Sequence, residues 1–405
     1  WLKNYPAEIP HEIDIPKMPV HQFLTDAYKA NPTKIAIHFM GKELTYKELY
    51  ESALKFANYL QNLGVEKGDR IAVMLPNCPQ AVIAYYGIMY AGGIVVQTNP
   101  LYTERELQYQ MADSGAKIIL GLDILYPRIT KILKETQIEN VIITGIKDYL
   151  PFPKNLVYPF IQKKQYGFSV KVEHSGMNHL FVEIMRSAPL KEITIPCDFE
   201  EALALLPYTG GTTGFPKGVM LTHKNLIANT MMCDAWLYKC EDGQEIVLGI
   251  LPFFHVYGMT TVLILSVMKK SKMVLMPKFD VEDTLKTIDK QKPTLFPGAP
   301  TMYIGLLNHP DIGKYNLSSI KARLSGSAPL PVELQERFET IMVYPEDAPT
   351  QFCDKHITVS YCTSGNGVAN EYCHKFHNVG AAVLKDKALV KFTKAKLDEI
   401  FMCNG

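Results

Sequence analysis

The chain carries almost no net charge. Its 405 residues include 42 basic and 41 acidic side chains, which leaves a formal net charge of +1. A balance this close produces no long-range field that would draw the protein to nucleic acid or to anionic lipid. We therefore expect no nucleic acid partner, and any phosphate that the protein binds must be held by a local site.

The chain also lacks the signs of secretion and of membrane insertion. No basic region near the start is paired with an uninterrupted apolar one, so no secretory signal is predicted. Because the chain starts at Trp1 rather than Met, we expect that a few residues have been trimmed. The longest apolar run, Ile250–Met268, is interrupted by proline, histidine, tyrosine and glycine, which favours a buried strand, loop and helix start over a membrane span. Eight cysteines without a secretory context predict free thiols in a reducing compartment, and hence a cytoplasmic protein.

What the chain does contain is a regular alternation of strand and helix patterns. The strand Arg70–Leu75, the helix Gln80–Ala91 and the strand Ile94–Gln97 predict a β-α-β unit. Further strands are expected at Lys34–His38, Lys117–Leu120, Asn140–Thr144, Met273–Leu275 and Thr294–Phe296. Further helices are expected at Leu44–Leu63, with its start at Thr45, and at Pro127–Thr136 and Val281–Lys290. We therefore expect an α/β fold with a mostly parallel sheet wrapped by helices. Residues 145–200 are less regular and are interpreted as a variable connector.

The most informative segment begins at Tyr208 with Tyr-Thr-Gly-Gly-Thr-Thr-Gly-Phe-Pro-Lys-Gly and leads to a predicted helix start at Thr222. Its glycines allow backbone N–H groups to approach an anion, its threonines add hydroxyl donors, and Lys217 adds a positive charge. The segment is not a Walker A loop, because two residues separate Gly214 from Lys217. It predicts a triphosphate-binding loop. The alternative is a Gly/Thr-rich hairpin turn with a solvated lysine, which would not explain the three threonines.

This segment resembles the phosphate loop of the adenylate-forming superfamily, in particular that of the long-chain fatty acid–CoA ligases. Further segments resemble that family in order and spacing: Leu44–Leu49, Gly64–Arg70, Gly92–Pro100, Leu251–Met259, Phe296–Pro300 and Ser325–Pro329. The resemblance covers residues 1 to 339. It implies the large N-terminal domain of the adenylate-forming enzymes, truncated, with the small C-terminal domain absent.

The resemblance implies ATP-dependent activation of a medium- or long-chain fatty acid to acyl-AMP, followed by transfer to CoA. Fatty acid, ATP and CoA would be the partners, with Mg²⁺ as the metal. The implied phosphate-binding residues are Thr209, Gly210, Gly211, Thr212, Thr213, Gly214 and Lys217, and Thr209 would also contact the Mg²⁺. The implied catalytic residues are Lys217 and His255. An acyl and adenine pocket would be lined by His255, Met259, Gly326, Ser327, Ala328 and Pro329, with Met259 at a position where some family members carry a tryptophan gate.

The pattern fails after one further predicted helix, Pro331–Glu339. The family motif Gly-Tyr-Gly-x-Thr-Glu does not follow, and the segment Ser360–Gly365 keeps a tyrosine but not the acid, so we interpret it as a chance match. The Thr-Gly-Asp motif that binds ribose in the family, and the C-terminal lysine, are missing as well. Weak nucleotide binding and little turnover are therefore predicted.

Residues 340–405 differ from the rest in composition. They hold four of the eight cysteines, at Cys353, Cys362, Cys373 and Cys403, together with His356, His374 and His377. We interpret this tail as an unrelated or aberrant segment, such as one translated in a wrong frame or joined by splicing. The alternative is a zinc site formed by Cys353, His356, Cys373 and His377.

Two other functions stay open beside the fatty acid–CoA ligase. One is another acid–CoA ligase, aryl-specific or luciferase-like. The other is a catalytically incomplete protein that binds a nucleotide or an acyl chain. The acyl length, formation of a homodimer and peripheral contact with a membrane are not determined by these patterns.

Overall fold

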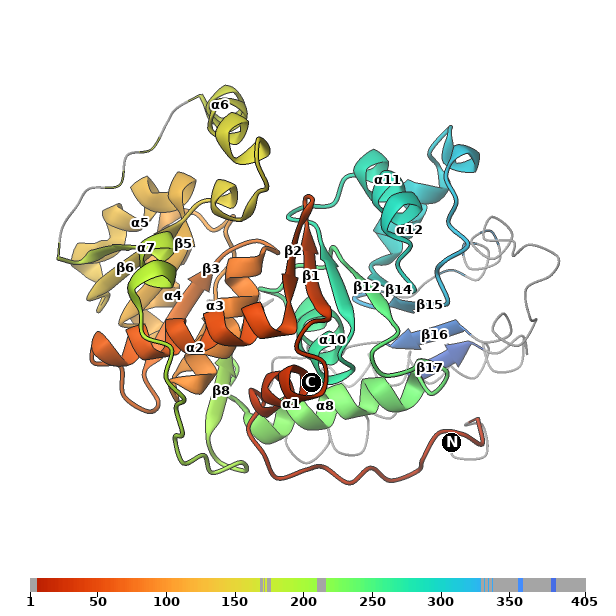
Figure 1. Ribbon diagram of the computed structural model, residues 1–405, viewed down its shortest axis with the longest axis horizontal. Coiled ribbons are helices and arrows are strands. Elements are labelled where there is room, and N and C mark those ends of the chain that lie inside the picture. The colour runs from red at the N-terminus through yellow and green to blue at the C-terminus, as the bar shows by residue number, and fades with distance from the viewer. Residues whose placement is uncertain are drawn as a thin grey trace, which may run out of the picture.

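The computed structural model describes residues 6–167, 170, 172, 176–209, 216–328, 331, 334 and 337, and the backbone of 356–359 and 380–383. Two large sheets stand side by side with helices around and between them (Figure 1). Both sheets are mixed and mostly parallel, so the predicted α/β architecture is confirmed for this part of the chain.

The first sheet has seven strands in the order β11-β8-β4-β3-β5-β6-β7. Its strands are β3 (Arg70–Met74), β4 (Ile94–Gln97), β5 (Ile118–Leu122), β6 (Asn140–Thr144), β7 (Asn178–Leu180), β8 (Leu203–Leu206) and β11 (Leu221–Thr222). All neighbours are parallel except β11, which returns antiparallel to β8. Parallel strands that are covered on both faces have continuous apolar sequences. Strands β4 and β5 are covered in this way, because each of their residues is buried.

The second sheet has the order β17-β16-β15-β14-β12-β13-β1-β2. Its strands are β1 (Ile35–Phe39), β2 (Lys42–Thr45), β12 (Ile246–Gly249), β13 (Lys272–Leu275), β14 (Leu295–Gly298), β15 (Ala322–Ser325), β16 (His356–Val359) and β17 (Gly380–Val383). The outermost pairs, β1 with β2 and β16 with β17, are antiparallel, and the central pairs are parallel.

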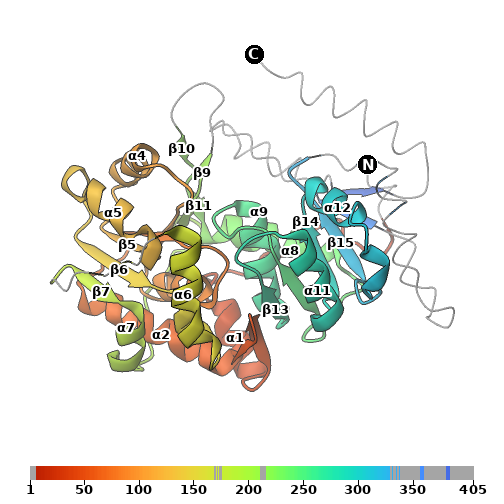
Figure 2. The ribbon, with the colours of Figure 1, turned by 90° about the horizontal axis from the view of Figure 1, so that it is seen from above.

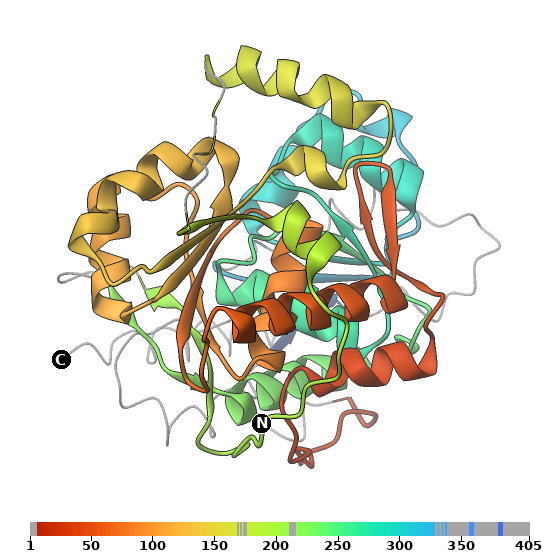
Figure 3. The ribbon, with the colours of Figure 1, turned by 60° about the vertical axis from the view of Figure 1, so that its left-hand side comes forward.

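The longer helices cover and separate these sheets (Figures 1 and 3). They are α1 (Gln22–Ala30), α2 (Tyr46–Asn62), α3 (Pro79–Tyr90), α4 (Glu104–Ser114), α5 (Tyr126–Ile132), α6 (Lys154–Tyr166), α7 (Phe181–Ser187), α8 (His223–Trp236), α11 (Val281–Gln291) and α12 (Pro300–Leu307). Between β12 and β13 the chain forms α9 (Val256–Gly258), a π-helical stretch (Met259–Ile264) and α10 (Leu265–Met268).

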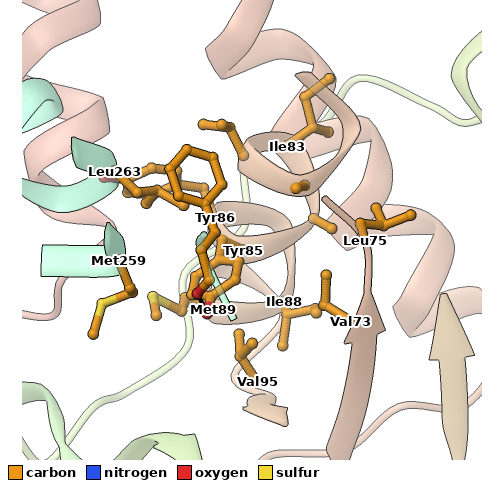
Figure 4. Packing of buried hydrophobic residues seen from close by; sticks show 14 of the residues in the cluster. Val73, Leu75, Ile83, Tyr85, Tyr86, Ile88, Met89, Val95, Met259 and Leu263 are labelled. Atoms are coloured by element: carbon orange, nitrogen blue, oxygen red, sulfur yellow. Dashed lines mark hydrogen bonds between the residues drawn. The ribbon is translucent and has the colours of Figure 1, made fainter. Parts of the chain in front are cut away.

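Helix α3 forms the centre of the core. All twelve of its residues are buried, because it is apolar around its whole circumference and lies between the two sheets. Tyr85, Tyr86 and Met89 point toward Met259 and Leu263 of the second sheet's helical crossover (Figure 4). Residues that follow β12 are therefore fixed against residues that follow β3.

Local signals set the starts of three helices. Thr45, Thr103 and Thr222 each accept a hydrogen bond from the backbone three residues on, and Glu48, Glu106 and Asn225 return a bond to the cap backbone. This reciprocal arrangement satisfies N–H groups that the helix cannot pair internally. The helix starts predicted at Thr45 and Thr222 are confirmed.

Some expectations need correction. The described part of residues 145–200, interpreted from sequence as a less regular connector, holds α6, β7 and α7. The strand β2 was not predicted, since Leu44 was assigned to a helix; residues with positive φ at Met40 and Gly41 turn the chain back into a hairpin instead.

Other expectations hold. The run Ile250–Met268 is largely buried, as a loop and a helical crossover. No helix within the described ranges is long and apolar enough to cross a membrane. The four described cysteines, Cys78, Cys197, Cys233 and Cys240, are free thiols.

The tail contributes β16 and β17 to the edge of the second sheet. The division of the chain at residue 339 stays a prediction. The helix predicted at Pro331–Glu339 lies mostly outside the described residues, as do Cys353, Cys373, His377 and the side chain of His356, so the zinc alternative is not tested.

Candidate active site

The residues that flank the predicted phosphate loop form a pair of short strands. Strand β9 (Tyr208–Thr209) pairs antiparallel with β10 (Lys217–Gly218), which places Lys217 directly opposite Thr209. The Lys217 side chain is exposed, so its ammonium group is accessible to a ligand. The loop residues Gly210, Gly211, Thr212, Thr213, Gly214 and Phe215 lie outside the described residues. The two ends of the loop are thus adjacent, as a loop folded around an anion requires.

Helix α4 holds the base of this hairpin, which projects beside it in Figure 2. The Tyr208 hydroxyl donates to the Asp113 carboxylate at 2.6 Å, and the Tyr109 hydroxyl donates to the Pro216 carbonyl at 3.1 Å. Burial and the neighbouring Asp113 raise the pKa of Tyr208, so this hydroxyl keeps the proton that it donates. Gly218 packs on the Tyr208 ring, where an added Cβ would lie 3.1 Å from the ring. Both strands of the hairpin are therefore tied to one rigid helix.

The segment Leu251–His255 is fixed by buried amide side chains of the first sheet. Asn77 Nδ2 donates to the carbonyls of Gly249 (3.0 Å) and Leu251 (2.8 Å), and its Oδ1 accepts from the Phe253 N–H at 2.9 Å. Asn77 is only 2% exposed. A buried amide with three such bonds is a strong positional constraint, because a buried backbone group that loses its partner is costly; the Gly249 carbonyl alone among the three also accepts from the Met276 N–H, at 3.0 Å.

A second buried amide acts on the same segment. Gln97 Nε2 donates to the Phe253 carbonyl at 2.6 Å and to the Tyr85 hydroxyl at 2.5 Å. Gln110 of α4 in turn donates to the Gln97 carbonyl at 2.8 Å. Helix α4 therefore contacts both the hairpin base and the residues that support the Leu251–His255 segment.

His255 is exposed at the end of this segment and caps α9. Its Nδ1 accepts a hydrogen bond from the Tyr257 N–H at 3.2 Å, so in the neutral ring the proton is on Nε2. Although part of the ring faces solvent, the surrounding protein atoms lower the pKa of His255 by desolvation. The side chain thus presents a neutral N–H donor at pH 7.

The carboxyl ends of β14 and β15 meet the start of α9. The Tyr257 hydroxyl donates to the Leu324 carbonyl at 2.5 Å, and the Tyr303 hydroxyl donates to the carbonyls of Phe296 (2.8 Å) and Leu324 (2.9 Å). Gly326 N–H donates to the Gly298 carbonyl at 3.3 Å. The motif segments around residues 255, 298 and 326 are thereby brought to one edge of the second sheet, where ligands of α/β proteins usually bind.

The predicted pocket residues differ in exposure. Gly326 is buried, whereas Ser327 and Ala328 are exposed, and Ser327 has a φ of 72°; Pro329 lies outside the described residues. Met259 is 1% exposed and packs in the core near Tyr86 and Met89 (Figure 4). The assignments of these residues and of the phosphate-binding residues stay predictions. Within the described residues, no group of three or more His, Cys, Asp or Glu side chains could hold a metal ion.

Four residues with positional roles were not identified from the sequence: Asn77, Gln97, Tyr109 and Asp113. Asn77 stands between a predicted strand and Pro79, a position from which a polar side chain can form hydrogen bonds with the backbone of another sheet. This position was the one sequence feature that could have indicated its role. The partners of the other three are more than a hundred residues away or in another element, so no local pattern marks them.

Comparisons with known proteins agree with this arrangement. The AMP-binding enzyme family matches residues 24–346. The chain is 53% identical to a long-chain-fatty-acid–CoA ligase of Bacillus subtilis over 342 residues, which are 84% of this chain and 61% of that protein. It is 33% identical to the Escherichia coli enzyme of the same name over 346 residues, again 84% of this chain and 61% of the relative. The chain therefore spans about 61% of the length of these relatives.

A solved structure shows the same fold. A long-chain-fatty-acid–CoA ligase from Archaeoglobus fulgidus superposes with a TM-score of 0.72 at 23% identity, covering 89% of this chain and 67% of that one. Since the family match includes most of the chain, all of the first sheet and the second sheet from β1 to β15, this protein belongs to the AMP-binding enzyme family.

Proposed function

We propose that this chain carries the nucleotide- and acyl-binding part of an AMP-forming fatty acid–CoA ligase. The proposal rests on one observation: α4 and the residues that it bonds hold two motifs in place. These motifs are the Thr209/Lys217 hairpin and the His255 segment. The names of the two bacterial relatives give the substrate class, a long-chain fatty acid.

The proposed reaction has two steps. A carboxylate oxygen of the fatty acid attacks the α-phosphorus of ATP, the bond to the β-phosphate oxygen breaks, and pyrophosphate leaves with its electron pair. The thiolate of CoA then attacks the acyl carbon, and AMP leaves. Each step brings anionic groups together, so each needs positive charge and N–H donors placed in advance.

We assign Lys217 and the amides of residues 210–214 to the β- and γ-phosphates, since Lys217 is exposed opposite Thr209 at the mouth of the loop. Thr212 and Thr213 would add hydroxyl donors. His255 would donate its Nε2–H to the fatty acid carboxylate or the α-phosphate, because Nδ1 already accepts a bond from Tyr257.

Mg²⁺ is part of the proposal. It favours hard oxygen ligands and keeps waters and substrate phosphates in its shell, so a site with few protein ligands fits it. Thr209 would contact the ion through its side-chain hydroxyl. When bound, Mg²⁺ would neutralise phosphate charge. A cytoplasmic location likewise remains a prediction, and the oligomeric state stays open.

The test is exchange of labelled pyrophosphate into ATP that depends on an added fatty acid. Residues 340–405 contain no Gly-Tyr-Gly-x-Thr-Glu motif, so we expect slow but measurable exchange with medium- or long-chain acids. Lys217→Ala should reduce it about 100-fold through the loss of a phosphate contact. The matched control is Lys29→Ala, another exposed lysine, which should leave the rate unchanged.

Two results would overturn the proposal. Exchange with aromatic acids alone would indicate an aryl–CoA ligase. Saturable ATP binding without exchange for any carboxylate would support the catalytically incomplete alternative. An equal rate in Lys217→Ala and the parent chain would remove Lys217 from the site.

A further inference from the structure

Helix α6 exposes an unusual amount of apolar surface. Among described residues, ten large apolar side chains are exposed, and five of them belong to α6 or the turn before it. Their exposed fractions are 79% for Phe152, 60% for Leu156, 50% for Val157, 75% for Phe160 and 54% for Ile161. Single exposed apolar residues are ordinary, but a contiguous group marks an interaction surface.

The apolar residues of α6 occupy the face that points away from the protein. Leu156, Val157, Phe160 and Ile161 follow a spacing of one, three and one residues, which places them on one side of a helix. The opposite side attaches α6 to the body: Gln162 Nε2 donates to the Asp123 carboxylate at 2.8 Å, and Tyr158 packs against the core. The helix is thus held by its mixed face, and within the described part of the chain its apolar side chains stay largely exposed.

Positive charge accompanies this face. Lys154, Lys163 and Lys164 are exposed on α6, and the sequence from Tyr149 to Gly167 contains no aspartate or glutamate. The Lys154 ammonium group donates to the Met40 carbonyl at 2.9 Å, which brings the 38% exposed Met40 to the end of the same patch. The whole chain is nearly neutral, so this is a local concentration of cations.

The combination of apolar side chains and lysines on α6 indicates which kind of partner can bind this face. A second copy bound through the same face would set lysines near lysines, because a two-fold interface repeats one patch on both sides, and like charges oppose such pairing. An anionic lipid bilayer satisfies both features at once, since its headgroups attract lysine and its acyl boundary accepts Phe, Leu and Ile. Helix α6 also stands at the outer edge of the molecule, as the yellow helix at the top of Figure 3.

We propose that α6 docks the protein on an anionic lipid bilayer. Phe152, Leu156, Phe160 and Ile161 enter the boundary between headgroups and acyl chains, and Lys163 and Lys164 face the lipid phosphates. The inference goes beyond the proposed function, and its test needs no ATP, CoA or fatty acid, so either one can fail while the other stands.

Flotation of the full chain with vesicles tests the proposal. Phosphatidylcholine vesicles that contain phosphatidylglycerol should bind it at least about tenfold more strongly than phosphatidylcholine alone, because each surface lysine near anionic lipid adds roughly a fivefold gain. The triple variant Leu156→Ser, Phe160→Ser, Ile161→Ser should lose at least about tenfold in partitioning. It should keep the parent melting temperature, since these side chains are exposed.

Matched controls distinguish binding through this surface from nonspecific binding by other exposed apolar or charged side chains. Leu101→Ser changes an apolar residue that is 81% exposed in another part of the chain, and it should bind vesicles like the parent. Lys163→Gln with Lys164→Gln should weaken binding to anionic vesicles, whereas Lys29→Gln with Lys67→Gln, two exposed lysines outside α6, should not. Phe160→Trp should shift its emission to shorter wavelength on anionic vesicles, and Leu101→Trp should not.

Three results would overturn the proposal. The first is equal vesicle binding by the parent and the triple variant. The second is no preference of the parent for anionic vesicles. The third is self-association of the parent that the triple variant abolishes, without vesicle binding, because a second copy would then cover the face.

Discussion

At the scale of single residues, the histidines of this chain occupy contrasting environments. His255 is exposed, and its ring orientation is set by one backbone N–H. His223 is 5% exposed at the start of α8, and its Nδ1 accepts from the Val20 N–H at 3.1 Å, next to His21. The first arrangement leaves a donor available to a ligand, whereas the second joins the N-terminal segment to the body.

The His223 contact predicts acid sensitivity. Burial lowers the pKa of His223 to about 4, and burial together with His223 lowers that of His21 to about 3. Below pH 6.5 the unfolded chain binds protons that the folded chain does not, so stability is fully present above pH 6.5 and is lost as the pH falls toward 4. For His223 alone the free energy of unfolding should be about 2 kcal/mol lower at pH 5 than at pH 7.5.

Urea unfolding at the two pH values measures this difference. His223→Gln should lower stability at pH 7.5, because Val20 loses its partner, yet it should flatten the pH dependence. His11→Gln, at an exposed histidine, is the control and should keep the parent slope. Identical slopes for the parent and His223→Gln would contradict the assignment.

At the scale of elements, the packing of α9 against the loop before it determines where His255 stands. Gly258 lies so close to that loop that an added Cβ would be 2.5 Å from the carbonyl oxygens of both Leu251 and Pro252. Only a residue without Cβ allows this approach. The glycine is therefore required by a backbone contact between two elements, and not by its own φ.

Gly258→Ala should destabilise the protein by about 3 kcal/mol, because backbone atoms cannot move aside as a flexible side chain can. It should also reduce fatty-acid-dependent exchange, since the loop carries His255. Gly313→Ala is the matched control: nothing lies within 4 Å of its added Cβ, and its stability should change by less than about 1 kcal/mol. Thermal and urea denaturation compare the two, and similar losses in both would refute the argument.

At the scale of the whole molecule, the two sheets are joined by polar bonds as well as by the apolar surface of α3. Asn77 follows β3 of the first sheet and bonds the carbonyl of Gly249 at the end of β12, in the second sheet, and two backbone groups of the segment that follows β12. Its removal would take a hydrogen-bond partner from each of these groups, of which the Gly249 carbonyl keeps a second one, the Met276 N–H. Hydrogen bonds of this kind fix the distance between the two sheets, whereas apolar contacts alone would allow that distance to vary.

We expect Asn77→Ala to lower the free energy of unfolding by about 3 kcal/mol, as unpaired buried groups are each costly. The His255 segment should also become more mobile, which hydrogen exchange of the Phe253 amide would detect. Asn62→Ala, an exposed position at the end of α2, serves as control and should change stability by less than about 0.5 kcal/mol. A change that small in Asn77→Ala would show that the bonds do not hold the segment.

The sequence by itself determined the local elements and the family. The strands Ile94–Gln97 and Asn140–Thr144 and the helix starts at Thr45 and Thr222 follow from apolar runs and capping residues, which act over a few positions. The phosphate-loop composition and the ordered motifs identified the AMP-binding enzymes, since such a set does not arise by periodicity.

Only the tertiary structure decided how the motifs are supported and what remains on the surface. The bonds from Asn77 to Phe253 and from Tyr109 to Pro216 connect residues 176 and 107 positions apart, and no local pattern encodes such a distance. The sequence likewise did not indicate that the apolar face of α6 is exposed, because an apolar stripe on a helix predicts burial. Whether that stripe is covered depends on which face the rest of the chain binds, and here Gln162 and Tyr158 fix the opposite one.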